Sequence, residues 1–123
     1  MNTIGIEKVN LTDALSRIEG HWRPRIAGEL NGQHVKLAKM LGEFPWHTHD
    51  DADEMFLVLH GAFRLELRDS AVDVCTGEMV VVPRGVEHRP VAEHEAHVMV
   101  FEPAGTVNTG ADINEFTAAA EWI

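Results

Sequence analysis

The sequence predicts an all-β protein, a sandwich or barrel built from short strands. Six to nine short segments have the apolar and alternating character of strands, turns rich in Gly and Pro separate them, and no helix-length periodicity lies between them. The 123 residues, 45% of them hydrophobic, suit one domain with one conventional core. An α/β fold, with helices alternating with strands, finds little support in this pattern.

The first 24 residues look peripheral to that core. Thr12 is a candidate N-cap for a short helix that runs to about Ile18, and Asp13 is favourably placed in its first turn. We expect this helix to lie against the outside of the strands.

The core is expected to occupy residues 25–103. Asn31-Gly32 is a strong signal for a two-residue hairpin between strands at 26–30 and 35–39. Apolar and alternating residues at 55–59 and 63–68, on either side of Gly61, predict a second hairpin.

Two further strands complete the predicted core. Val72 and Val74 lead through a Gly turn into a strand at 79–82, which Pro83-Arg84-Gly85 ends. The last core strand is expected from about His97 to Phe101. Residues 104–123 form a second peripheral segment, with 116–123 either a short helix or a frayed tail.

Composition excludes several classes of site and partner. Cys75 is the one cysteine, so the chain can form neither an internal disulfide nor a thiolate metal cluster. A formal net charge of −10, with scattered Lys and Arg, disfavours binding to nucleic acid and to anionic lipid. The sequence has neither a secretory leader pattern nor an apolar run long enough to cross a bilayer, so we expect a cytoplasmic protein without a membrane partner.

Four residues form the central candidate site. His47 and His49 stand at i and i+2, so on an extended segment both imidazoles project to the same side. Glu54 follows at the start of a strand, and His88 lies five residues after Pro83. Three imidazoles and one carboxylate suit one divalent transition-metal ion, such as Zn, Fe, Mn or Ni, better than Ca or Mg.

The same residues resemble the two motifs of the cupin superfamily. The first motif reads here as Gly42, His47-Thr48-His49, Glu54, six residues and Gly61; the second reads as Gly77, five residues, Pro83-Arg84-Gly85, two residues and His88. Two departures are a spacing of four residues before His47, where five is usual, and Ala92, where the second motif usually closes with Asn. Neither departure involves a candidate ligand.

The resemblance implies a single small cupin-2 type domain over residues 1–123, folded as a jelly-roll barrel, with His47, His49, Glu54 and His88 as metal ligands. It also implies a small-molecule substrate and a homodimer, for which 25–30 is the candidate strand joining the partner's sheet. The favoured activity is that of a metal-dependent isomerase, cyclase or lyase, with Glu54 as ligand or as catalytic base. An Fe(II)-dependent dioxygenase and a non-catalytic module that binds a sugar or small acid are the alternatives.

Other polar residues have weaker motif support. His34, His60 and His94 are interpreted as surface residues, whereas His97 begins a strand near the second motif and is expected to be able to reach the cavity. Four large apolar residues are expected in the core or the cavity wall: Phe44, Trp46, Phe56 and Met99. Three cationic residues are candidates for binding a substrate carboxylate, although a solvated strand face is the favoured interpretation: Arg23, Lys36 and Arg64.

Overall fold

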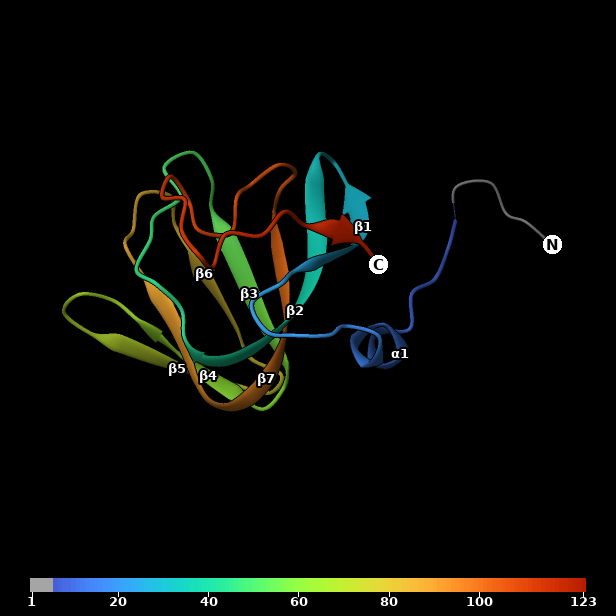
Figure 1. The fold of residues 1–123 in the computed structure, drawn as a ribbon, viewed down its shortest axis with the longest axis horizontal. Coiled ribbons are helices and arrows are strands. Elements are labelled where there is room, and N and C mark those ends of the chain that lie inside the picture. The colour runs from blue at the N-terminus through green and yellow to red at the C-terminus, as the bar shows by residue number, and fades with distance from the viewer. Residues whose placement is uncertain (1–5) are drawn as a thin grey trace.

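The computed structural model describes residues 6–123, and it confirms an all-β barrel with one short helix near the N-terminus (Figure 1). The eight strands form one hydrogen-bonded sheet in the order β5-β4-β7-β2-β1-β8, and β3 pairs with β6 and β7. The bounds of these elements are α1 Leu11–Ser16, β1 Arg25–Leu30, β2 Gln33–Glu43, β3 Glu54–His60, β4 Ala62–Glu66, β5 Ala71–Cys75, β6 Met79–Val82, β7 Arg89–Pro103 and β8 Glu121–Trp122.

The first predicted hairpin is confirmed. Asn31 and Gly32 have φ values of 52° and 75°, which are the left-handed conformations that a tight two-residue turn requires. Strands β1 and β2 pair on either side of this turn, with Leu30 opposite Gln33.

The second predicted hairpin is wrong, because β3 and β4 each pair with β7 rather than with each other. Strand β7 is 15 residues long, far longer than the predicted strand at 97–101, and its two halves receive the two shorter strands. Gly61 is therefore a corner between them. A Cβ at this position would lie 3.0 Å from the carbonyl oxygen of Glu95, so the close approach of β7 favours glycine.

Both peripheral segments differ in detail from the sequence prediction. The helix begins after Asn10, whose side chain accepts a hydrogen bond from Asp13 N at 2.9 Å, so Asn10 rather than Thr12 is the cap. The segment after Phe116 is irregular and ends in β8, which pairs in parallel with β1. A tertiary contact with the sheet, which local periodicity cannot reveal, thus replaces the predicted helix or tail.

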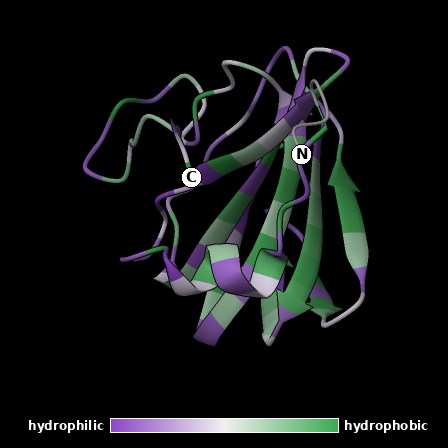
Figure 2. Ribbon diagram, turned by 90° about the vertical axis from the view of Figure 1, so that its right-hand side faces the viewer, coloured by the Kyte–Doolittle hydropathy of each residue, from purple (hydrophilic) through white to green (hydrophobic). Residues whose placement is uncertain are grey.

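Strand alternation divides the apolar residues into two clusters. The larger fills the barrel and includes Met40, Phe56 and Val98. The smaller lies outside it, where Ala14, Leu15 and Ile18 cover Leu37 on the outer face of β2. Figure 2 shows α1 crossing in front of the green, hydrophobic strands, as predicted for an external helix.

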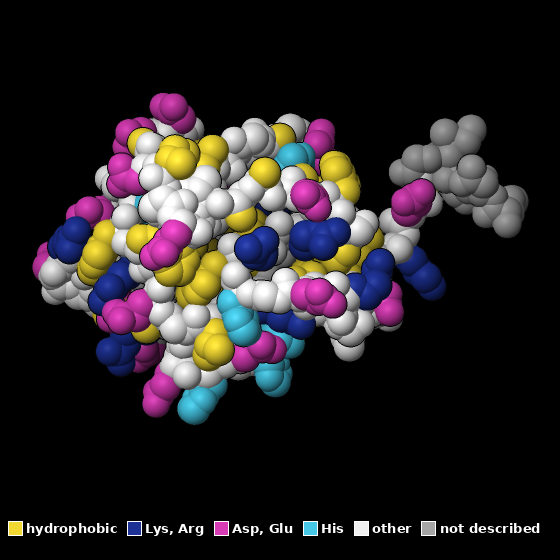
Figure 3. All heavy atoms as spheres, in the orientation of Figure 1, with side chains coloured by type: hydrophobic (Ala, Val, Ile, Leu, Met, Phe, Trp, Pro, Cys, Tyr) yellow, Lys and Arg dark blue, Asp and Glu magenta, His cyan; other side chains and the backbone are white. Residues whose placement is uncertain are grey.

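On the face shown in Figure 3, Lys and Arg side chains are interspersed with Asp and Glu. Within residues 6–123 no helix is long and apolar enough to span a membrane.

Candidate metal centre

The structure brings the four predicted ligands together inside the barrel. One potential ligand atom from each of His47, His49, Glu54 and His88 lies within 4.8 Å of the others. All four side chains are buried, with at most 7% of their surface exposed. This group could hold a metal ion, because imidazole nitrogen and carboxylate oxygen are the donors that divalent transition metals prefer.

Backbone contacts between two loops hold the histidines in place. The N–H groups of His47 and His88 each donate to the other residue's carbonyl oxygen at 3.0 Å, forming an isolated antiparallel bridge. The carbonyl of His49 accepts a hydrogen bond from Gly85 N at 3.0 Å. Glu54 enters the same space because it is the first residue of β3 and lies in phase with the inward-facing Phe56.

The ring nitrogens have the arrangement that a metal ligand needs. Nδ1 of His47 donates to the carbonyl of Pro45 at 3.0 Å, and Nδ1 of His88 donates to that of Val86 at 2.9 Å. In a neutral imidazole, this bond leaves the lone pair on Nε2. Nε2 of His49 is buried and has no hydrogen-bond partner in the described part of the chain.

Burial keeps the three imidazoles neutral. It lowers the pKa of His47 to about 3 and that of His49 to about 4, with a further lowering from the nearby His88 in each case. Burial also lowers the pKa of His88. Neutral imidazole is the form that binds metal, so these rings need not lose a proton at neutral pH.

Glu54 lies between two of the histidines. Its Oε1 is 3.3 Å from Nε2 of His88, and its Oε2 is 3.6 Å from Nε2 of His49. Burial raises the pKa of Glu54 to about 7. A cation at the centre would favour the ionised carboxylate, so the donor set fits a divalent metal ion both in chemistry and in charge.

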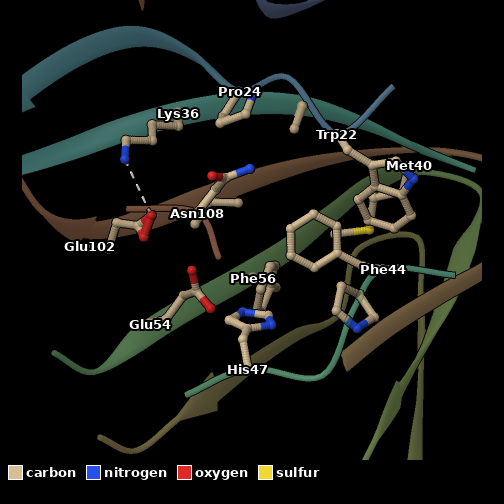
Figure 4. A pocket seen from close by; sticks show the side chains of 13 residues that line it. Trp22, Pro24, Lys36, Met40, Phe44, His47, Glu54, Phe56, Glu102 and Asn108 are labelled. Carbon is tan, nitrogen blue, oxygen red and sulfur yellow. Dashed lines mark hydrogen bonds and ion pairs between the residues drawn. The ribbon is translucent and has the colours of Figure 1, made fainter. Parts of the chain in front are cut away.

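A cavity of about 50 Å³ adjoins this group, and His47 and Glu54 belong to its wall. Figure 4 shows aromatic and apolar side chains at one end of the cavity and Lys36 with Glu102 at the other. The complete lining is Trp22, Pro24, Lys36, Ala38, Met40, Phe44, His47, Glu54, Phe56, Pro90, Val100, Glu102 and Asn108.

Comparison with known proteins establishes the family. The model of the cupin domain family, Cupin_2, matches residues 33–103, which is more than half of the chain. The chain belongs to the cupin family. Its four clustered residues could bind a metal ion, which is consistent with this family, and its barrel is the cupin fold.

Two solved structures are similar to this cupin over most of its length. A cupin-2 domain containing protein from Shewanella frigidimarina is 43% identical, with a TM-score of 0.76, over 77% of this chain and 93% of the other. Protein NMB1881 from Neisseria meningitidis is 32% identical, with a TM-score of 0.74, over 80% and 100% of the two chains.

Similarity to curated proteins covers less of each relative. Protein YdbB of Bacillus subtilis is 37% identical over 62 residues, which are 50% of this chain and 55% of that protein. The chain spans little more than half the length of the curated relatives it matches.

The structure corrects the weaker assignments to the cavity. Phe44 and Phe56 line it, but Trp46 lies beneath the guanidinium group of Arg68, whose Cζ is 4.0 Å from the ring centroid. Met99 is not part of the cavity wall but packs against the outer hydrophobic cluster, in agreement with the core alternative, because β7 alternation points it away from the barrel interior. His97 lies outside the cavity lining, and its ring hydrogen-bonds to Glu95 at 2.9 Å.

Two buried charged residues of the cavity wall differ from the sequence prediction or are absent from it. The sequence favours a solvated strand face for Lys36, yet this residue is only 2% exposed. Glu102, which no motif indicates, is also 2% exposed. Strand alternation offered a signal for both, since Lys36 is in phase with the buried Ala38 and Met40, and Glu102 with Val98 and Val100.

Proposed function

We propose that this cupin is a metal-dependent enzyme acting on a small organic molecule. His47, His49, Glu54 and His88 would hold one divalent transition-metal ion. The observation that supports this proposal best is the cavity of about 50 Å³, which places space for a ligand directly beside two of the four residues. A purely structural ion would need no such space, because structural sites are closed by their ligands.

The favoured reaction class is a proton transfer without redox change: isomerisation, cyclisation or elimination. When bound, a divalent ion supplies Lewis-acid polarisation of a substrate carbonyl or stabilisation of an enediolate. Glu54 borders both the ligand group and the cavity, so its carboxylate can serve as ligand, and an oxygen left free can accept a substrate proton. The apolar wall around Phe44 and Phe56 would exclude water from the proton transfer.

Metal content tests the proposed centre. Metals should be quantified by ICP-MS in untagged protein purified without chelator, beside the variants His49→Ala and His94→Ala. We expect about one equivalent of metal in the wild type and in His94→Ala, because His94 is exposed and remote from the group, and far less in His49→Ala. Wild-type protein that takes up neither Zn, Mn, Ni nor Fe would contradict the proposal.

Turnover is tested separately on the loaded protein. Proton NMR in deuterated buffer would detect exchange at the C–H group next to the carbonyl in a panel of small hydroxy and keto acids. Exchange that requires metal and is lost in Glu54→Gln supports the isomerase, cyclase or lyase class. Iron at one equivalent with substrate-dependent oxygen uptake would favour the dioxygenase alternative, and ligand retention without turnover would favour a binding module.

The homodimer remains a prediction. In the monomer, β8 pairs with Arg25 and Ile26 of β1, and the rest of that edge forms no strand pair within residues 6–123. This exposed part of the edge is where we propose that a second subunit adds its strand. Light scattering would test it, and a monomer at micromolar concentration would contradict it.

A further inference from the structure

The polar end of the cavity is formed by Lys36 of β2 and Glu102 of β7, which we call the polar pole. Nζ of Lys36 lies 3.3 Å from Oε1 of Glu102 and 3.3 Å from the carbonyl oxygen of Thr106. Both side chains line the cavity and are 98% buried, since each is 2% exposed. A buried ion pair rarely stabilises a fold more than apolar residues of the same size would, so its presence beside a ligand cavity calls for a functional reason.

Each partner of the polar pole retains an unused hydrogen-bonding position. Oε2 of Glu102 is buried and has no hydrogen-bond partner in the described part of the chain. The ammonium group of Lys36 carries three hydrogens, and the two acceptors named above engage two of them. An acceptor and a donor therefore lie next to each other. Burial, together with the neighbouring carboxyl of Glu54, raises the pKa of Glu102 to about 8, and apart from that carboxyl the described part of the chain gives them no further partner.

A hydroxyl group complements this arrangement. Its hydrogen can be donated to Oε2 of Glu102 while its oxygen accepts from Nζ of Lys36. A ligand that lacked the hydroxyl would leave a buried carboxylate oxygen without a donor, which is costly in a site of low dielectric.

The position of the polar pole relative to the metal centre limits the ligand further. Figure 4 shows Glu54 beside Glu102. His47 lies between Glu54 and the apolar end of the cavity, which is formed by Trp22, Met40 and Phe44. Glu54 and Glu102 are near neighbours because Phe56 pairs with Val100 across β3 and β7, two residues from each carboxylate. A ligand oxygen at the metal centre and a ligand hydroxyl at the polar pole can thus belong to one small molecule.

We propose that the polar pole selects small ligands that carry a hydroxyl group near a metal-binding carboxylate or carbonyl oxygen, that is, small hydroxy acids or hydroxy ketones. This inference rests on the proposed metal centre. It assigns Lys36 and Glu102 a role in specificity, with Lys36 holding Oε1 of Glu102 at the cavity wall.

Cobalt(II)-loaded protein provides a test that does not depend on turnover. Visible absorption of the bound cobalt would report binding of two matched pairs of probes: glycolate against propionate, and 3-hydroxypropanoate against butanoate. Within each pair, the acids differ by a hydroxyl in place of a methyl group. We expect at least one hydroxy acid to bind about tenfold more tightly than its counterpart, which is the size of one hydrogen bond to a charged group.

The control is the double variant Lys36→Met with Glu102→Leu, which removes both charges at similar volume. It should still bind cobalt with the same spectrum, because the four ligands are intact, and should lose the preference. Equal affinities within both pairs, binding of none of the four acids, or a preference that persists in the double variant would overturn the inference. The last result would mean that the hydroxyl binds the metal itself. Failure of the wild type to bind cobalt would instead overturn the metal centre, and the inference with it.

Discussion

The four candidate ligands His47, His49, Glu54 and His88, which we call the metal cluster, and the polar pole border the same cavity. They nevertheless depend on the chain in different ways. His47 and His88 are fixed by two neighbouring loops through hydrogen bonds to Pro45, Val86 and each other, and the carbonyl of His49 accepts a hydrogen bond from Gly85 N. Lys36 and Glu102 are 66 residues apart and meet because β2 and β7 pair in one particular register, with Lys36 opposite Val100. A motif therefore specifies the metal cluster, whereas the whole barrel specifies the polar pole.

This difference predicts which residues in each of the two groups can be substituted. The cluster requires four defined residue types, so sequence alone can reveal it. The polar pole requires only two inward positions that lie close together across β2 and β7, so we expect that both residues can be replaced together without changing the fold. Specificity for the ligand is expected to reside where replacement is tolerated, and metal binding where it is not.

The largest expected effect on stability comes from removing one partner of the polar pole. Glu102→Ala leaves the Lys36 ammonium buried without its carboxylate, and we expect a loss of about 3–5 kcal/mol in the free energy of unfolding. The double variant Lys36→Met with Glu102→Leu should lose much less, because it leaves no unpaired charge. Urea denaturation of the two variants measures both values.

Equal stability of Glu102→Ala and the double variant would contradict the difference proposed between the polar pole and the metal cluster. In that case the two side chains would be solvated or would not interact energetically. The register of β2 and β7 would then not require oppositely charged residues at these two positions. His49→Ala is the matched control in the metal cluster. We expect it to cost less stability than Glu102→Ala in metal-free protein, because Nε2 of His49 makes no hydrogen bond there.

The second-largest expected effect tests whether the metal cluster depends on a segment that is distant from it in the sequence. Gly110 has a φ of 67°, and a Cβ there would lie 2.0 Å from the carbonyl oxygen of Thr48, between His47 and His49. Gly110→Ala must therefore displace the histidine loop or the C-terminal segment. We expect a loss of about 2–4 kcal/mol in unfolding free energy from strain and overpacking, with weaker metal binding.

Gly105→Ala is the control for Gly110→Ala. Gly105 also has a positive φ, of 88°, but a Cβ there would meet nothing within 4 Å. It should show only the backbone cost, about 1–2 kcal/mol, and unchanged metal affinity. Equal effects of the two variants on metal binding would mean that the C-terminal segment does not support the cluster.

These two regions also explain how far the sequence could predict the structure. The fold class, the Asn31-Gly32 hairpin and the four clustered residues follow from local patterns, and the structure agrees with each of them. The pairing of β3 and β4 with β7 could not be deduced, because Gly61 is as compatible with a hairpin turn as with a corner. Strand periodicity reveals which face a residue occupies but not which strand lies next to it.

The polar pole illustrates the same limit for the site. Alternation places Lys36 and Glu102 on inward faces, but a charged residue on a strand is usually solvated, and only the register shows that the two meet. The contact of Gly110 with Thr48 was equally hidden, since it joins a loop after the last barrel strand to the first motif.

A third prediction concerns the pH dependence of metal binding. The pKa values of His47 and His49, about 3 and 4, mean that both rings are already neutral above pH 5. Glu54, with a pKa of about 7, must instead lose a proton before it can act as a ligand below that pH. Of these three ligands, only Glu54 binds protons in competition with the metal between pH 5 and pH 7, so affinity should rise with pH and level off above about 7.

The expected rise in affinity is about 50-fold between pH 5 and pH 7, which corresponds to about one proton released for each ion bound below pH 7. Competition with a zinc chelator at several pH values measures it. Glu54→Gln should bind more weakly and show little dependence on pH over this interval. A slope of two or three protons would mean that the histidines titrate as well, and that burial does not keep the cluster neutral.

The smallest effect belongs to a region outside both groups. Asn10→Ala removes the side-chain acceptor for Asp13 N at the start of α1, and we expect a loss of about 1 kcal/mol in unfolding free energy. Metal affinity and ligand preference should not change, because α1 packs on the outer face of β2 through Leu37 while Lys36 points inward. Thermal unfolding and cobalt titration of this variant measure the two properties independently. A change in cobalt affinity would show that the outer cluster controls the position of β2, and that the cavity depends on the peripheral helix as well as on the barrel.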